Sequence, residues 1–191
     1  MDTEKIEWFL RGNWAPLSEE KELNDLKVDG SIPTELDGIY VRTGPNPKDG
    51  KGSHWFLGDG MVHGIRLKKG KAEWYRNRFV QTPDITEPLT DPMAGLGDLR
   101  RGKGNTHVVA HNEQIMCLEE AHWPWTINAD LETTGVLNYE GKLDCSMTAH
   151  PKICPVTGEL LAFSYFSFEQ PYLKYIRVSA DGKLQQVEGI E

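Results

Sequence analysis

The sequence has little positive charge, few cysteines and no long apolar segment, and each shortage excludes a class of protein. Lys and Arg number 21 against 29 Asp and Glu, for a net charge of -8. No nucleic-acid partner is expected, because binding phosphates requires clustered cations. The apolar runs fall well short of the roughly 20 residues that a membrane-spanning helix needs, and the acidic start at residues 1–4 is unlike a signal peptide. We therefore expect a cytoplasmic protein.

The cysteines do not form a recognisable framework. Cys117, Cys145 and Cys154 make an odd set without CxxC spacing, which disfavours both a disulfide scaffold and a zinc knot. We interpret all three as small buried hydrophobic residues.

Glycine and proline are abundant, with 19 Gly and 11 Pro in 191 residues, and they separate short runs typical of β-strands. Long helices are not expected, and the fold class is all-β. Repeated hairpins of this spacing fit a sandwich or a propeller equally well. The predicted strands cover Ile39–Arg42, Met61–Leu67, Lys71–Val80, Val108–Ala110, Gln114–Glu119, Leu160–Phe168, Tyr172–Ser179 and a last run after the Ala180–Lys183 turn.

Two segments lack this pattern. Residues 1–26 form an N-terminal arm, in which Ser18–Leu23 is compatible with one or two helical turns. Between Gln81 and Gly104 the chain is rich in Pro and Gly and is predicted to be a structureless connection. Connections this long are uncommon in compact domains and are often functional, although a surface excursion without a role fits equally well.

His150 is the candidate metal ligand. It follows a β-type segment and precedes Pro151, which fixes its own backbone and biases His150 toward an extended conformation. A stiffly held imidazole at a strand end suits a transition metal such as Fe(II), which accepts imidazole nitrogen. A single ligand does not complete a site.

The other histidines are less persuasive as ligands. His107 and His111 could share an ion on a helix, but their context is β-like, and four strand steps separate them by about 13 Å. His54 and His63 flank a Gly-Asp-Gly turn, and His122 stands beside Trp123-Pro124-Trp125. We interpret His122 as an aromatic-cluster or turn residue.

Five blocks of sequence occur together in a characteristic order and approximate spacing. They are Gly30–Pro47, His54–Gly64, Tyr75–Val80, Asn105–Val109 and Thr148–Lys152. In this respect the chain resembles the carotenoid cleavage oxygenase family, from about Leu26 to Glu191. The resemblance implies a seven-bladed β-propeller with a non-haem iron on its axis, held by four histidines. It also implies cleavage of a conjugated C=C bond by O₂, and it implies a structural role rather than a ligand role for His54 and His63.

Length is the main departure from the family, whose members are more than twice as long. The other three iron ligands then lie beyond Glu191, and His150 is the one ligand carried over. We expect residues 27–191 to be the N-terminal part of the propeller dioxygenase domain, roughly its first two to three blades, truncated before the rest. The family's acidic residues that contact the ligand imidazoles and orient them are expected in later blades, and this fragment alone is expected to be inactive.

The resemblance leaves the substrate open between carotenoids or apocarotenoids and stilbenes. The stilbene branch has a Lys in the strand that here reads Cys117-Leu118-Glu119-Glu120, so a small apolar polyene of the carotenoid type is favoured. Fe(2+) is the expected cofactor and O₂ the co-substrate. The alternative is a non-catalytic β module that serves as a scaffold or binds a partner. We also expect the fragment to self-associate through unpaired blade edges, and we expect peripheral membrane contact in the full-length protein.

Overall fold

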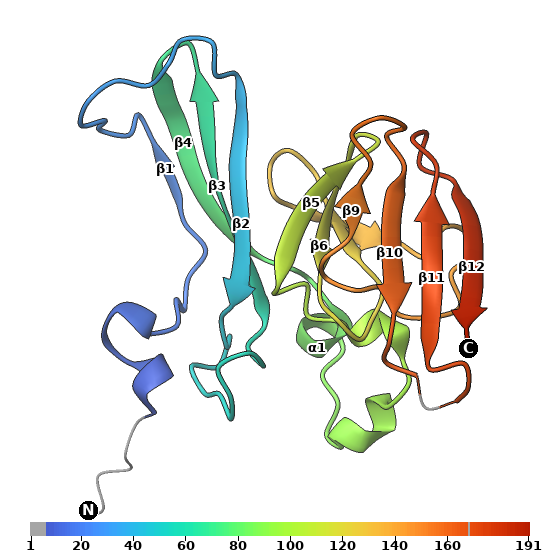
Figure 1. Ribbon diagram of the computed structural model, residues 1–191. Coiled ribbons are helices and arrows are strands. Elements are labelled where there is room, and N and C mark those ends of the chain that lie inside the picture. The colour runs from blue at the N-terminus through green and yellow to red at the C-terminus, as the bar shows by residue number, and fades with distance from the viewer. Residues whose placement is uncertain (1–6, 168) are drawn as a thin grey trace, which may run out of the picture.

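The computed structural model describes residues 7–167 and 169–191, and it contains three four-stranded antiparallel sheets placed side by side (Figure 1). The first has the order β1 (Glu22–Asn24), β4 (Lys71–Phe79), β3 (Gly60–Lys68), β2 (Gly38–Pro45). The second runs β5 (His107–His111), β6 (Gln114–Leu118), β7 (Trp125–Ile127), β8 (Thr133–Val136). The third runs β9 (Lys152–Ile153), β10 (Leu160–Ser164), β11 (Leu173–Val178), β12 (Leu184–Ile190).

The strands β2, β5 and β9 lie next to one another in the middle of the molecule, with β1 and β12 at its two sides (Figure 1). Each sheet therefore resembles one four-stranded propeller blade, with β2, β5 or β9 as its inner edge strand. The prediction of an all-β partial propeller of two to three blades is confirmed.

Local turn chemistry explains why the hairpins were predictable. Lys69 and Gly70 have φ of 48° and 77° and connect β3 to β4, while Asn112 and Glu113, with φ of 45° and 62°, connect β5 to β6. Two successive residues with positive φ form the type of turn whose twist matches that of a β-hairpin.

Two apolar cores hold the sheets together, one at each interface. Between the first and second sheets the fully buried side chains are Val62, Val80, Cys117 and Leu131. Between the second and third sheets the core contains Met116, Leu118, Leu143, Met147, Leu160, Ile176 and Val178. Cys117 and Cys145 are buried as predicted, and burial raises the pKa of the Cys117 thiol to about 12. Cys154 lies half-buried in a turn, so that part of the prediction is wrong.

The N-terminal arm differs from the prediction. Glu22–Asn24 form β1 instead of a helical turn, because they pair with Trp74–Arg76 of β4. Two short 3₁₀ helices, Trp8–Leu10 and Gly12–Trp14, precede it. Trp8 stacks on Trp55 at a centroid distance of 5.1 Å, which attaches the arm to the β2–β3 loop. Residues 1–6 of the arm lie outside the described part of the chain.

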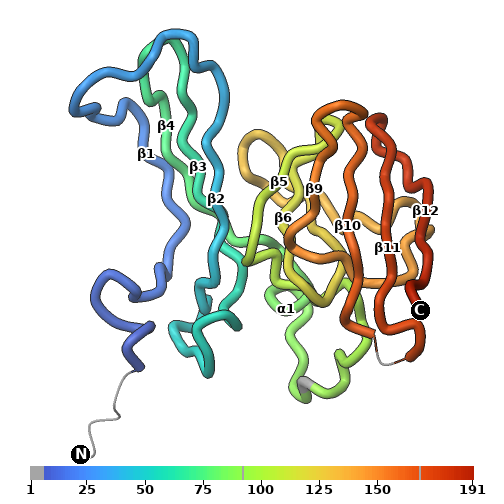
Figure 2. The backbone as a smooth tube through the Cα atoms, viewed as in Figure 1, coloured from blue at the N-terminus to red at the C-terminus, as the bar shows by residue number. Residues whose placement is uncertain are grey.

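The connection between β4 and β5 is also more ordered than predicted. It contains α1 (Pro83–Thr86) and two 3₁₀ helices, Pro92–Gly95 and Leu99–Arg101, and it loops out at the lower end of the molecule (Figure 2). Lys103 anchors it, because its Nζ lies 2.9 Å from Asp59 and 3.0 Å from Asp84. Within the described ranges, no helix is long and apolar enough to span a bilayer.

Several strands were missed or shortened by the sequence patterns. The pattern did not indicate β7, β8 or β9, which have only two to four residues each. The run predicted as Leu160–Phe168 ends as a strand at Ser164, and Phe168 is outside the described residues.

Candidate metal centre

His150 lies on the segment that enters the inner strand of the third sheet. Thr148 and Ala149 are almost completely buried, Pro151 is buried, and the imidazole itself is 61% exposed. The backbone N–H of His150 donates to Thr148 Oγ1 at 3.2 Å. Burial of the residues on both sides therefore fixes the backbone of His150 while its ring remains accessible.

Glu120 is the side chain that holds this segment. Its Oε2 accepts hydrogen bonds from Thr148 Oγ1 at 3.0 Å and from the Ala149 N–H at 3.1 Å. Its Oε1 lies 3.0 Å from Nε2 of His150. A carboxylate beside an imidazole is the usual partner of a metal-ligating histidine, because it fixes the ring orientation.

Sequence reasoning missed this role of Glu120, since it expected the orienting acids in later blades. The structure places a carboxylate beside His150 within this chain, in the loop that follows β6. The signal in the sequence is the Glu119-Glu120 pair directly after a buried strand, where the resemblance places a Lys that grips the substrate. Glu119 instead contacts His122, with 2.6 Å between Oε2 and Nδ1.

His107 is the nearest other imidazole. Its ring centroid is 6.0 Å from that of His150, with an angle of 26° between the planes. Its Nδ1 lies 2.7 Å from the carbonyl oxygen of Ala149, and because a carbonyl can only accept, Nδ1 carries the proton. His107 therefore supports the His150 segment from β5.

The remaining histidines have partners away from His150. His111 is at the far end of β5 and contacts the carbonyl of Gly158 at 2.9 Å. The helical arrangement that would let His107 and His111 share an ion is absent from this strand. His63 Nδ1 is 2.8 Å from the Tyr75 hydroxyl, and burial together with the nearby Arg42 lowers the pKa of His63 to about 4. His54 Nδ1 accepts from the Phe56 N–H at 3.2 Å.

A hollow of about 430 Å³ lies beside His150 and Glu120. Its other walls come from the end of β2, the β2–β3 loop and the approach to β5. These lining residues are Thr43, Gly44, Pro45, Trp55, Phe56, Asn105 and Thr106. The hollow thus combines two aromatic rings with one imidazole and one carboxylate, as ligand sites commonly combine apolar walls with a few polar groups.

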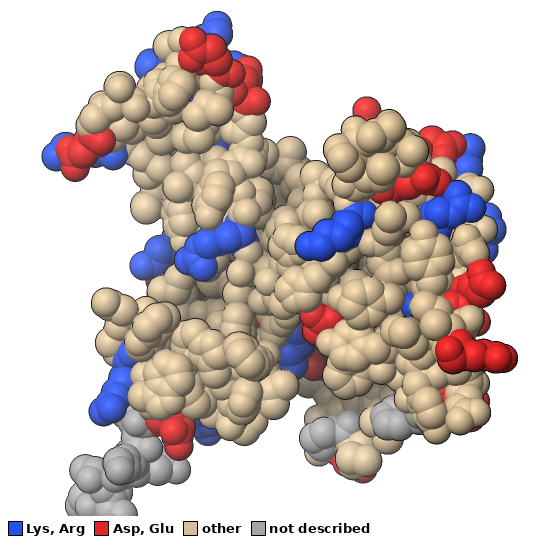
Figure 3. Space-filling view, viewed as in Figure 1, with Lys and Arg blue, Asp and Glu red and all other residues tan. Residues whose placement is uncertain are grey.

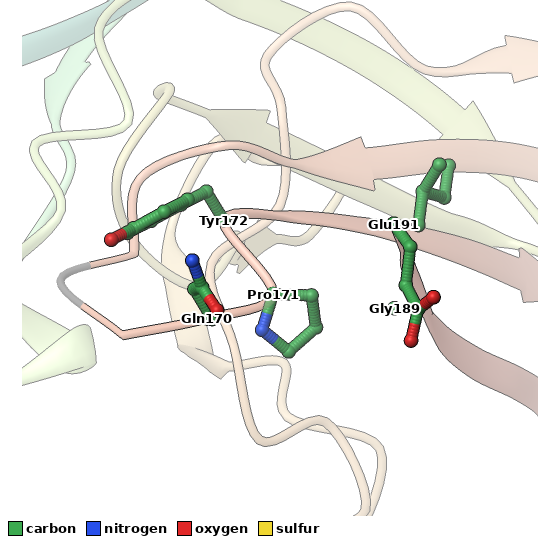
Figure 4. Close-up of a pocket in the computed structure, with 6 residues that line it drawn as sticks. Gln170, Pro171, Tyr172, Gly189 and Glu191 are labelled. Carbon is green, nitrogen blue, oxygen red and sulfur yellow. The ribbon is translucent and has the colours of Figure 1, made fainter.

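A second and larger hollow, of about 570 Å³, lies at the end of the third sheet (Figure 4). Gln170, Pro171 and Tyr172 line one side and Gly189, Ile190 and Glu191 the other. It offers no histidine or cysteine, so its chemistry is poorer than that of the hollow at His150. We therefore take the smaller hollow as the candidate site.

The described residues supply one part of a metal site. Within residues 7–167 and 169–191, no group of three or more His, Cys, Asp or Glu side chains is arranged to hold a metal ion. An exposed imidazole with a carboxylate partner nevertheless has the donor chemistry that iron accepts. His150 stays a prediction as a ligand.

Charge on the surface does not form a single large patch on the face shown in Figure 3. Lys and Arg side chains are interspersed there with Asp and Glu. The expectation of no nucleic-acid partner stays a prediction.

Comparison with known proteins identifies the family. Residues 14–191 match the family described as Retinal pigment epithelial membrane protein. The carotenoid cleavage oxygenase of Mycobacterium tuberculosis is 40% identical, over 96% of this chain and 38% of its own length. The carotenoid 9,10(9',10')-cleavage dioxygenase 1 of Arabidopsis thaliana is 38% identical, over 91% and 38%.

A solved structure agrees in fold. The lignostilbene dioxygenase of Pseudomonas brassicacearum superposes with a TM-score of 0.78 at 31% identity, covering 94% of this chain and 41% of that chain. The chain spans about two fifths of the length of the relatives it matches. The two relatives described above are a carotenoid cleavage oxygenase and a carotenoid cleavage dioxygenase. By motif order, sequence identity and blade architecture, the chain belongs to the Retinal pigment epithelial membrane protein family.

Proposed function

We propose that this chain is the N-terminal part of a non-haem Fe(II) dioxygenase that cleaves a C=C bond of a carotenoid or apocarotenoid into two carbonyl products. The observation that carries the proposal is the pairing of His150 with Glu120 at the wall of a partly aromatic hollow. Iron, when bound, would supply the open coordination position at which O₂ reacts.

The residues of this chain would prepare the site. Glu120 orients His150, and the two hydrogen bonds that its Oε2 accepts stiffen the segment before β9. The rings of Trp55 and Phe56 offer apolar surface to a polyene and help to exclude water. Positioning one particular double bond beside the metal is the main contribution that such walls make.

A chimera tests this proposal directly. We would join residues 1–191 to the part of the M. tuberculosis relative that follows the matched region, and measure bound iron together with aldehyde formation from an apocarotenal. About one iron per chain and aldehyde products are expected. His150→Ala is expected to abolish both, with His111→Ala as the matched control, because His111 lies at the far end of β5. Full iron content and activity in the His150→Ala chimera would contradict the proposal.

Stilbene cleavage is the second candidate, and the likeness to the lignostilbene dioxygenase favours it. Against it, Glu119 and Glu120 stand where the resemblance places the phenol-binding Lys. Both carboxylates are engaged, Glu119 with His122 and Glu120 with His150. Competition between an apocarotenal and a hydroxystilbene in the chimera distinguishes the two substrates.

A non-catalytic β module that serves as a scaffold or binds a partner is the third candidate. Iron binding by the 191-residue chain alone provides the test. We expect no tight binding and no polyene cleavage, because one imidazole cannot outcompete water and buffer for Fe(II). Tight one-to-one iron would refute this expectation.

Self-association is also proposed for this chain. β1 and β12 are the outer edge strands of the first and third sheets, and an edge strand presents unpaired backbone N–H and C=O groups to a second chain. These two edges lie at the two sides of the molecule (Figure 1), where another copy could pair with them. Light scattering should show species larger than a monomer, and a monomer at high concentration would contradict the proposal.

Peripheral membrane contact of the full-length protein is proposed from the connection between β4 and β5. Its most exposed apolar side chains are Met93 at 67% and Leu96 at 66%, which we call the connection tip. Apolar side chains held out at one end of a molecule are suited to the boundary between headgroups and acyl chains.

A further inference from the structure

Asn105 is a buried polar residue whose side chain makes three hydrogen bonds. It is 5% exposed and stands just before β5. Its Nδ2 donates to the carbonyl oxygen of Phe56 at 3.0 Å and to that of Gly58 at 2.7 Å. Its Oδ1 accepts from the hydroxyl of Thr106 at 3.0 Å. Both amide hydrogens are therefore committed to the β2–β3 loop.

The loop that Asn105 holds carries an exposed aromatic ring. Phe56 is 67% exposed and lines the hollow beside His150. The loop has no regular secondary structure at this point, and the carbonyls of Phe56 and Gly58 accept hydrogen bonds from the Asn105 side chain. Without Asn105, the carbonyls of Phe56 and Gly58 would lose those partners, and the ring would no longer be held at one place.

Backbone packing next to this clamp makes the arrangement tight. A Cβ built on Gly60 would overlap the carbonyl oxygen of Lys103 and lie 3.0 Å from the carbonyl carbon of Gly104. Thr43 Oγ1 also donates to the Gly104 carbonyl at 2.9 Å. The chain leading to Asn105 is thus in direct contact with the first residue of β3 and with β2.

We propose that Asn105 is a positioning residue that holds the Phe56 ring as an apolar wall of the hollow, and so sets how tightly an elongated polyene binds there. This inference rests on the proposed function, because that function supplies the ligand class. Asn105 acts through Phe56 and has no chemical role of its own.

A double-mutant cycle in the 191-residue chain tests this inference. The probe is all-trans-retinol, a polyene alcohol that forms no Schiff base with lysine, and binding is followed by energy transfer from tryptophan. Phe56→Ala should weaken binding about tenfold, as removal of an aromatic anchor commonly does. Asn105→Asp removes both N–H donors and places a carboxylate beside two carbonyl oxygens. It should therefore also weaken retinol binding, on the order of the loss expected for Phe56→Ala.

The decisive result is the double variant. If Asn105 acts through Phe56, Asn105→Asp combined with Phe56→Ala should bind retinol no more weakly than Phe56→Ala alone. The matched control is Asn77→Asp, since Asn77 is also fully buried and its Nδ2 donates to the carbonyl of Glu19 at 3.0 Å, but it does not line the hollow. This control should keep the affinity of the unchanged chain.

Three outcomes would overturn the inference. They are additive losses in the double variant, an unchanged affinity in Asn105→Asp, and an unchanged chain that does not bind retinol. The last outcome would remove the ligand class from this hollow. Failure of the proposed function is distinguished by the chimera, which reports iron and aldehyde formation and does not depend on the retinol affinity of the isolated chain.

Discussion

Gly60 is the first residue of β3, and the backbone of Lys103 and Gly104, just before β5, packs directly against it. Replacement of Gly60 by alanine should therefore destabilise the protein. The added Cβ would overlap the Lys103 carbonyl oxygen and come within 3.0 Å of the Gly104 carbonyl carbon and oxygen. The contacted atoms belong to the backbone, which cannot rotate away as the end of a flexible side chain can. The φ of Gly60 lies outside the left-handed region, so the effect is steric and not conformational.

The magnitude follows from the crowding. Overpacked substitutions typically cost about 1–3 kcal/mol, and a backbone obstacle places Gly60→Ala near the upper end, at about 3 kcal/mol. For a chain of this size, 1 kcal/mol corresponds to roughly 2–4 °C in Tm. The expected decrease is therefore roughly 6–12 °C, measured by thermal unfolding monitored by circular dichroism.

Gly38 provides the matched control, because it also begins a strand, β2. A Cβ at Gly38 would meet no atom within 4 Å, and its φ is outside the left-handed region. Alanine there should leave Tm unchanged or raise it slightly, since it reduces the entropy of the unfolded chain. A Gly60→Ala variant that melts within a degree of the Gly38→Ala variant would refute the reasoning.

Three further predictions concern acid stability, the His150 segment and membranes. The pKa of His63 is lowered from 6.5 to about 4, so between these pH values the unfolded state binds more protons than the folded state, and the free energy of unfolding should fall as pH decreases. His63→Gln should flatten this decrease when denaturation is measured at a series of pH values. An unchanged slope would contradict the role assigned to His63. Glu120→Ala removes the acceptor of the buried Ala149 N–H and should lower the free energy of unfolding in urea by about 1–3 kcal/mol. Hydrogen exchange of the Ala149 amide should also become faster. Protection of this amide equal to that in the unchanged chain would count against the role of Glu120. Met93→Asp combined with Leu96→Asp should reduce co-sedimentation of the full-length protein with phosphatidylcholine vesicles without changing Tm. Equal co-sedimentation would exclude the connection tip as the membrane contact.

The fold was predictable where the information was local. The β3–β4 and β5–β6 hairpins are encoded by adjacent strands of alternating pattern and two-residue turns with positive φ. In contrast, β1 has only three residues and forms because Trp74–Arg76, about fifty residues later, offers a free strand edge. No local pattern in Glu22–Asn24 indicates such a partner.

The candidate site divides in the same way. The sequence by itself determined the motif blocks that identify the family and the stiff backbone at His150, because proline restricts its neighbour locally. Only the tertiary structure decided that Glu120 faces His150 and that Asn105 holds the Phe56 loop. These pairs are 30 and 49 residues apart, and they meet because two cores pack three sheets side by side, which is a property of the whole chain and not of any segment.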